Sequence, residues 1–271
     1  MIKFPAVLVV LLSVLIALAL PSQAVARPGD VVHAELRPGW RQADGSYMAA
    51  LHLRLAPGWK TYWRVAGEAG LPPRIDWSAS QNLQAVRTHW PRPDVFEYSG
   101  YRSIGFFDEL VLPIEFIPAR ADAPMAIAAD VTIGVCLDVC VPVDLQVSAA
   151  LRGQGAPDPQ ISAALNLRAT AATAAGLRGV SCDISPDGDG LRLRVGLEMP
   201  ALGPAEVVVI EAPGSGLWVS DAKTARQGDT LHAEVSLRGP RHGAVALDRS
   251  ALRITVMTVD RMVEHRGCTA G

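Results

Sequence analysis

The 271-residue sequence lacks an excess of charge of either sign. Lys and Arg together number 25, Asp and Glu together number 27, and neither sign forms runs. Proteins that bind nucleic acid or anionic lipid by electrostatic attraction carry a strongly basic surface. The balance argues against nucleic acid as a partner and favours proteins or small molecules.

The motifs of several enzyme classes are also missing. The sequence contains no serine nucleophile elbow, no phosphate-binding loop, no paired-carboxylate motif and no Cys-x-x-Cys of the thioredoxin type. Six histidines are present, without the spacing of metal ligands around the cysteines: His33, His52, His89, His232, His242 and His265. We therefore expect no metal site and no cofactor, and any chemistry should belong to the four cysteines.

Long hydrophobic runs are confined to the N-terminus. Lys3 precedes an apolar run over residues 6–20 and the small-x-small motif Ala-Val-Ala at 24–26, which is the pattern of a secretory signal peptide. A membrane-spanning helix needs about 20 apolar residues, more than this run offers. We predict a signal peptide over 1–26 and an exported chain without stable membrane insertion. Cleavage two residues earlier and a retained anchor are the alternatives.

Long helical periods are rare, and 20 prolines and 24 glycines interrupt the sequence at short intervals. Apolar and polar residues alternate over 31–36, 47–55 and 191–198, which is typical of strands with one buried face. Further strands are expected at 129–135, 141–151, 206–212, 231–237 and 252–259. Short strands separated by frequent turns are typical of β-sandwiches, so we predict an all-β fold of two sandwich domains.

One helix is expected between the sandwiches. It should run over 159–175, with Asp158 as its N-cap, Pro159 at the first helical position and Gly176 just past its end. Such a short helix would serve as a connector. The predicted units are a first sandwich over 27–152, a linker over 153–179 and a second sandwich over 180–271.

The four cysteines fall into two pairs. In an exported protein an even number of cysteines usually means disulfides. Cys182 opens the second predicted sandwich and Cys268 closes it, whereas Cys136 and Cys140 lie together in the first. In the chain-entropy model, closing the long loop stabilises by about 4 to 5 kcal/mol and closing the short loop by about 2 kcal/mol. We predict that Cys182 and Cys268 form the structural disulfide.

Cys136 and Cys140 lie in the stretch GVCLDVCVPVD. On an extended strand they would be about 13 Å apart, too far for a disulfide, so the chain must turn between them. Pro142 and the β-branched residues on both sides argue against a helix, which predicts a hairpin with residues 137–139 as its loop. On spacing alone, the pair could be a redox couple, an inert local staple or a clip for Cu(I).

Three stretches carry a family resemblance: LAPGWKTYWRVAGEAGLPPRIDWSASQNL, FEYSGYRSIGFFDELVLPI and GVCLDVCVPVD. With LDRSALRITV and a GC near the end, they resemble the periplasmic N-terminal domain of the DsbD thiol:disulfide interchange family, especially its ScsB-like branch, which is linked to copper tolerance. The resemblance implies an immunoglobulin-like fold and a periplasmic location. It also implies a cysteine pair that accepts electrons from a membrane-embedded thiol reductase and passes them to thioredoxin-like proteins.

The resemblance assigns the redox pair to Cys136 and Cys140, with Cys140 as the sulfur that forms the mixed disulfide. Asp138 between them should disfavour a thiolate electrostatically. Two departures stand out: the best-known members have a wider cysteine spacing, and full-length members continue into membrane and thioredoxin-like domains that this sequence does not contain. We therefore expect a separate membrane partner. The alternative is a module that binds a protein or Cu(I), with structural disulfides only.

Members of the family also cover their cysteines with an aromatic cap loop. The matching segment here is 96–107, and Phe96 and Tyr98 are the candidate covering side chains. Phe106 and Phe107 border a predicted strand, so we expect both in the core.

Overall fold

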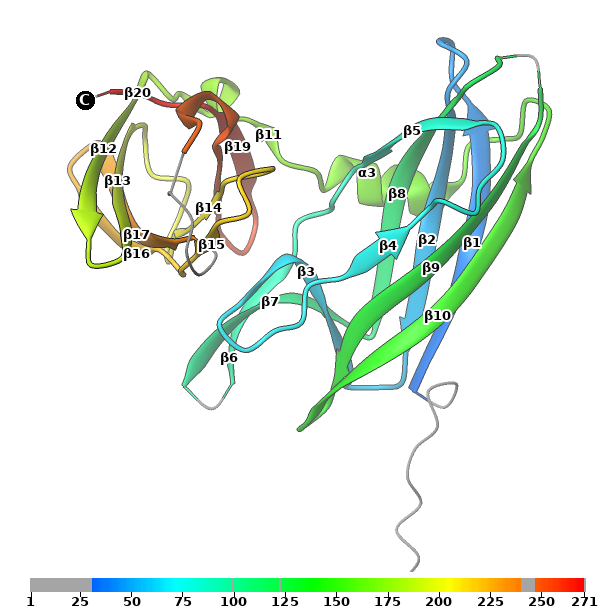
Figure 1. Cartoon of the computed structure of the whole chain (residues 1–271), viewed down its shortest axis with the longest axis horizontal. Coiled ribbons are helices and arrows are strands. Elements are labelled where there is room, and N and C mark those ends of the chain that lie inside the picture. Colours follow the sequence, from blue (N-terminus) through cyan, green and yellow to red (C-terminus); the bar gives the residue numbers. More distant parts are fainter. Residues whose placement is uncertain (1–30, 99, 122, 240–246, 271) are drawn as a thin grey trace, which may run out of the picture.

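The computed structural model describes residues 31–98, 100–121, 123–239 and 247–270. The predicted signal peptide over 1–26 lies outside these residues. The described strands form four sheets, two on each side of a short helical segment, and Figure 1 shows the two sheet pairs side by side. The fold is all-β and immunoglobulin-like, as the sequence predicts. Within the described residues, no helix is long and apolar enough to cross a membrane.

The first sandwich packs a four-stranded sheet against a six-stranded one. The smaller sheet has the order β1 (Val32–Arg41), β2 (Tyr47–Leu55), β8 (Glu109–Pro118) and β5 (Leu83–Thr88). The larger has the order β10 (Cys140–Leu151), β9 (Met125–Cys136), β3 (Lys60–Gly67), β7 (Tyr101–Phe107) and β6 (Asp94–Tyr98), with β4 (Arg74–Asp76) paired to β9. The core between the sheets includes Leu51, Leu53, Trp63, Ile104, Leu112, Ile114, Phe116 and Ile127.

The prediction of one buried face is wrong for β2, which is buried on both faces. Met48 and Ala50 point away from the main core and pack against Ile161 of a helix that covers this sheet. His52, on the same outer face, is only 2% exposed, and its ring nitrogens contact the carboxylates of Glu35 and Glu109 at 3.0 and 2.7 Å. Alternation could not reveal this burial because a helix distant in sequence supplies it.

The helix α3 (Pro159–Asn166) begins where the sequence predicts but ends nine residues early. Residues 170–171 form β11, which pairs in parallel with β19 (Met262–Arg266). A 3-10 helix η1 (Ala172–Ala175) follows, and Gly176 closes it with a φ of 89°. The continuous helix is therefore wrong, because strand pairing with the second sandwich replaces helical hydrogen bonds at 170–171.

The second sandwich has one sheet in the order β11, β19, β18 (Arg253–Met257) and β14 (Val207–Glu211). The other has the order β15 (Trp218–Val219), β17 (Thr230–Arg238), β13 (Gly190–Glu198), β12 (Gly179–Asp187) and β20 (Thr269–Ala270), with β16 (Lys223–Gln227) paired to β17. A short 3-10 helix η2 (Arg249–Ala251) precedes β18. The core between the two sheets of the second sandwich includes Leu193, Val195, Leu197, Leu231, Leu237, Leu252 and Ile254.

Replacing Asp158 by alanine should lower the free energy of unfolding by about 1 to 2 kcal/mol, because this carboxylate caps α3. It accepts hydrogen bonds from the backbone N–H groups of Gln160 and Ile161, and from Arg37 at 2.7 Å. Burial raises the pKa of Asp158, but these hydrogen bonds together lower it by more than burial raises it. The pKa of Asp158 therefore lies below its ordinary value. The stabilisation should therefore be present at neutral pH and be lost as the pH falls through the acidic range. Urea unfolding at neutral pH and at acidic pH measures this stabilisation. Asp229→Ala removes an exposed carboxylate and is the control, so it should change the free energy of unfolding little.

Candidate functional site

Cys136 and Cys140 form a disulfide at the end of the β9–β10 hairpin. The two residues are direct partners in the antiparallel register, with Cα atoms 4.2 Å apart, and residues 137–139 form the loop between them. The hairpin predicted from the spacing and from Pro142 is confirmed. The disulfide thus lies at the turn of the β9–β10 hairpin, at the lower end of these two strands in Figure 1.

The two cysteines differ in exposure. Cys136 is 1% exposed, whereas Cys140 is an exposed residue. Apolar side chains surround Cys140 on the hairpin: Leu137, Val139 and Val141 are 41%, 72% and 47% exposed. Of the two cysteines, only Cys140 is therefore an exposed residue, and an apolar surface surrounds it.

Tyr62 on β3 lies against both sulfurs. Its hydroxyl oxygen is 3.0 Å from Cys136 Sγ and 2.9 Å from Cys140 Sγ, and the residue is only 2% exposed. Burial raises the pKa of the Tyr62 phenol above its ordinary value, so the hydroxyl keeps its proton at neutral pH. Tyr62 could not be predicted from the sequence, because no local pattern marks a tyrosine 74 residues away from the first cysteine.

Lys60, two residues before Tyr62 on the same strand, also contacts the hairpin. It is 7% exposed, its Nζ donates a hydrogen bond to the Leu137 carbonyl at 2.6 Å, and it is the register partner of Cys136. Its Nζ also lies 5.9 Å from the centre of the Phe96 ring. Lys60 thus attaches the loop to β3 and lines the same cavity as the two cysteines. It too was missed from the sequence.

A small cavity of about 230 Å³ opens beside the disulfide. Its lining is mostly apolar and includes both cysteines together with Lys60, Tyr62, Ala69, Tyr101, Ser103, Leu137 and Asp138. The volume of this cavity is about that of one large side chain.

Phe96 packs on the buried side of the site. It contacts the cluster of Tyr62, Ala66 and Cys136, and its ring centre is 4.9 Å from that of Phe107. It belongs to strand β6 rather than to a loop. Tyr98 ends β6, and its side chain lies outside the described part of the structure.

Phe106 and Phe107, both expected in the core, differ in exposure. Phe106 is buried and stacks with Trp90, with ring centres 6.3 Å apart. Phe107 is 40% exposed and lies against Phe96, so its assignment to the core is wrong. The pleat of β7 turns neighbouring residues to opposite faces, and Phe107 is on the outer one.

The first sandwich, which holds this site, matches a known protein family. Residues 32–151 match the family described as "Thiol:disulfide interchange protein DsbD, N-terminal". The first sandwich is a DsbD N-terminal domain. The match spans β1 to β10 and includes Cys136, Cys140, Lys60 and Tyr62.

Solved structures resemble a larger part of the chain. The crystal structure of the N-terminal periplasmic domain of ScsB from Proteus mirabilis superposes with a TM-score of 0.65 at 24% identity, and covers 91% of this chain and 97% of that one. The reduced DsbD N-terminal domain of Neisseria meningitidis covers 51% of this chain and 100% of its own, with a TM-score of 0.31 at 17% identity. The ScsB likeness extends the shared fold to both sandwiches. No curated protein sequence matches the chain.

The second cysteine pair lies outside the DsbD N-terminal domain. Cys182 and Cys268 form a disulfide with Cα atoms 5.9 Å apart, and Cys182 is 1% exposed. The bond attaches the end of the chain to β12, next to the parallel pairing of β12 with β20. In the described residues, no group of three or more His, Cys, Asp or Glu side chains is arranged to hold a metal ion.

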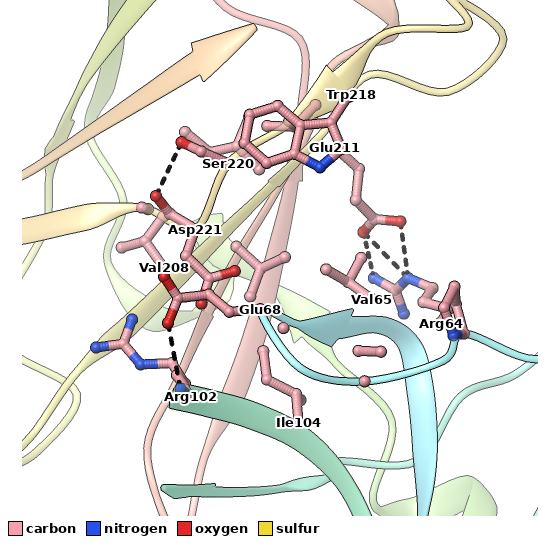
Figure 2. A pocket seen from close by; sticks show the side chains of 18 of the residues that line it. Arg64, Val65, Glu68, Arg102, Ile104, Val208, Glu211, Trp218, Ser220 and Asp221 are labelled. Atoms are coloured by element: carbon pink, nitrogen blue, oxygen red, sulfur yellow. Dashed lines mark hydrogen bonds and ion pairs between the residues drawn. The ribbon is translucent and has the colours of Figure 1, made fainter. Parts of the chain in front are cut away.

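A larger cavity of about 610 Å³ lies between the DsbD N-terminal domain and the second sandwich, and Figure 2 shows its charged side chains. Arg64 of β3 binds Glu211 across it, and Glu68 accepts a hydrogen bond from the backbone N–H of Arg102. Burial, and to a lesser extent the charge of Glu68, raise the pKa of Asp221. No cysteine is among the residues that line this cavity.

Proposed function

We propose that the protein is a periplasmic thiol:disulfide exchange protein that passes electrons between a membrane-embedded thiol reductase and thioredoxin-like proteins. The observation that carries the proposal is the unequal exposure of the two cysteines: Cys140 is open to attack, and Cys136 is enclosed beneath Tyr62 and Phe96. Family membership of residues 32–151 and the N-terminal signal-peptide pattern support the same function and location.

The exchange proceeds by two thiolate attacks. A partner thiolate attacks Cys140 Sγ, a new S–S bond forms, the Cys136–Cys140 bond breaks, and its electron pair goes to Cys136 Sγ. A second thiol of the partner then attacks the mixed disulfide and releases Cys140, so that two electrons have entered this protein. Reversal of these steps passes the electrons to an oxidised thioredoxin-like protein. Phe96, which packs against Cys136, restricts access to the inner sulfur.

The test is the capture of a mixed disulfide. In the full chain with Cys136→Ala, Cys140 should displace the leaving group from a single-cysteine thioredoxin activated as an aromatic mixed disulfide. The product is a covalent complex, visible on a non-reducing gel and cleaved by reductant. The matched variant Cys140→Ala retains only the buried Cys136 of this pair and should form little complex, because that residue is enclosed.

Equal and slow capture by both variants would contradict the proposal. So would a reduction potential of the Cys136–Cys140 pair below about −300 mV, the range of structural disulfides. Tight Cu(I) binding by the reduced protein that is lost in Cys136→Ser, without capture, would support the alternative of a binding module.

A further inference from the structure

The hydroxyl of Tyr62 is a hydrogen-bond donor to the disulfide. A sulfur in a disulfide carries no hydrogen, so in both contacts, at 3.0 and 2.9 Å, the Tyr62 O–H must be the donor. One hydrogen is shared between Cys136 Sγ and Cys140 Sγ. It can therefore follow negative charge to whichever sulfur becomes a thiolate, without movement of the ring.

Gly70 and Gly134 make room for the Tyr62 ring, because neither residue has a side chain. A Cβ at Gly134 would lie 3.1 Å from Tyr62 Cδ2 and 2.7 Å from Leu71 Cβ. A Cβ at Gly70 would lie 2.6 Å from Tyr62 Cδ1. Since the ring fits between these two backbones, the position of its hydroxyl is fixed before any reaction begins. Donors fixed in advance stabilise developing charge most effectively.

We propose that Tyr62 is a catalytic residue of the exchange reaction, whose hydroxyl stabilises the leaving thiolate. The inference rests on the proposed function for its biological setting, but it concerns a step that any thiol can start. When a thiolate attacks Cys140, the S–S bond breaks and the electron pair moves to Cys136 Sγ. Tyr62 keeps its proton and donates a hydrogen bond to that anion. When the second thiol releases Cys140, the same hydroxyl stabilises that sulfur.

The experiment measures the reduction of the Cys136–Cys140 disulfide by dithiothreitol in the full chain, followed by quenching and thiol alkylation. Dithiothreitol supplies both thiols and both electrons, and ends as its own cyclic disulfide. Tyr62→Phe should slow the reduction about 10- to 100-fold at every pH, the size expected for losing one hydrogen bond to a charged group. In the background of Cys140→Ala, Tyr62→Phe should also raise the pKa of the Cys136 thiol, measured from its ultraviolet thiolate absorbance.

Tyr47→Phe is the control, because it also removes a buried hydroxyl of the same sandwich. Tyr47 donates to the Gly39 carbonyl at 3.2 Å and does not contact the sulfurs. It should leave both the reduction rate and the thiol pKa unchanged. An unchanged rate and thiol pKa in Tyr62→Phe would overturn the inference, and so would equal slowing by Tyr47→Phe. Because dithiothreitol replaces every protein partner, this outcome is independent of the thioredoxin capture that tests the proposed function.

Discussion

Replacing Cys182 and Cys268 together by alanine should lower the free energy of unfolding of the second sandwich by about 4 to 5 kcal/mol. The bond closes a loop with a sequence separation of 86, and nearly all of that sandwich lies within the loop. Without it, the unfolded chain gains the conformational freedom that the bond removes. The short β20, held to β12 by a parallel register of only two residue pairs, should then detach easily.

Thermal unfolding followed by circular dichroism checks this, with an expected fall in Tm on the order of 20 °C for a unit of this size. Reduction of the Cys136–Cys140 disulfide by dithiothreitol should remain at the wild-type rate, because that pair lies in the other sandwich. A Tm close to that of the wild type would show that the core alone holds the second sandwich, and that Cys182–Cys268 is not its structural bond.

The parts of the site that the sequence predicted are those fixed by local chain geometry. The spacing of Cys136 and Cys140, with β-branched neighbours and Pro142, is sufficient to predict a hairpin, and the structure confirms it. The start of α3 was predictable for the same reason, since Asp158 caps the helix through contacts two and three residues away.

The parts that the sequence did not predict depend on pairing between distant strands. Tyr62 and Lys60 reach the hairpin because β3 lies beside β9, with Lys60 opposite Cys136. The end of α3 depends on the pairing of residues 170–171 with β19, more than 90 positions later. A pattern of alternation gives the faces of a strand but not its neighbours, so neither contact could be derived from it.

Replacing Arg64 by methionine should lower the free energy of unfolding by about 2 to 3 kcal/mol, because its guanidinium joins the two sandwiches. Its nitrogens lie 3.0 Å from carboxylate oxygens of both Glu211 and Glu264, and its side chain is 14% exposed. Methionine keeps the aliphatic volume but leaves two mostly buried carboxylates close together. We place the loss below that of a fully buried pair because Arg253 remains within 3.5 Å of Glu211 and 3.7 Å of Glu264.

Urea unfolding measures this loss. Limited proteolysis at residues 167–169 should be faster in Arg64→Met, because these residues connect α3, which packs on the first sandwich, to β11 of the second. Arg178→Met is the matched control: its ion pair with Asp229 is 54% and 75% exposed, so its removal should change stability by less than about 1 kcal/mol. Equal stability of the two variants would mean that solvent already screens the contacts of Arg64.

Arg64 also shares β3 with Lys60 and Tyr62, which have their own contacts with the hairpin. The dithiothreitol reduction rate should therefore stay unchanged in Arg64→Met, and a slower rate would show that the second sandwich acts on the disulfide through β3.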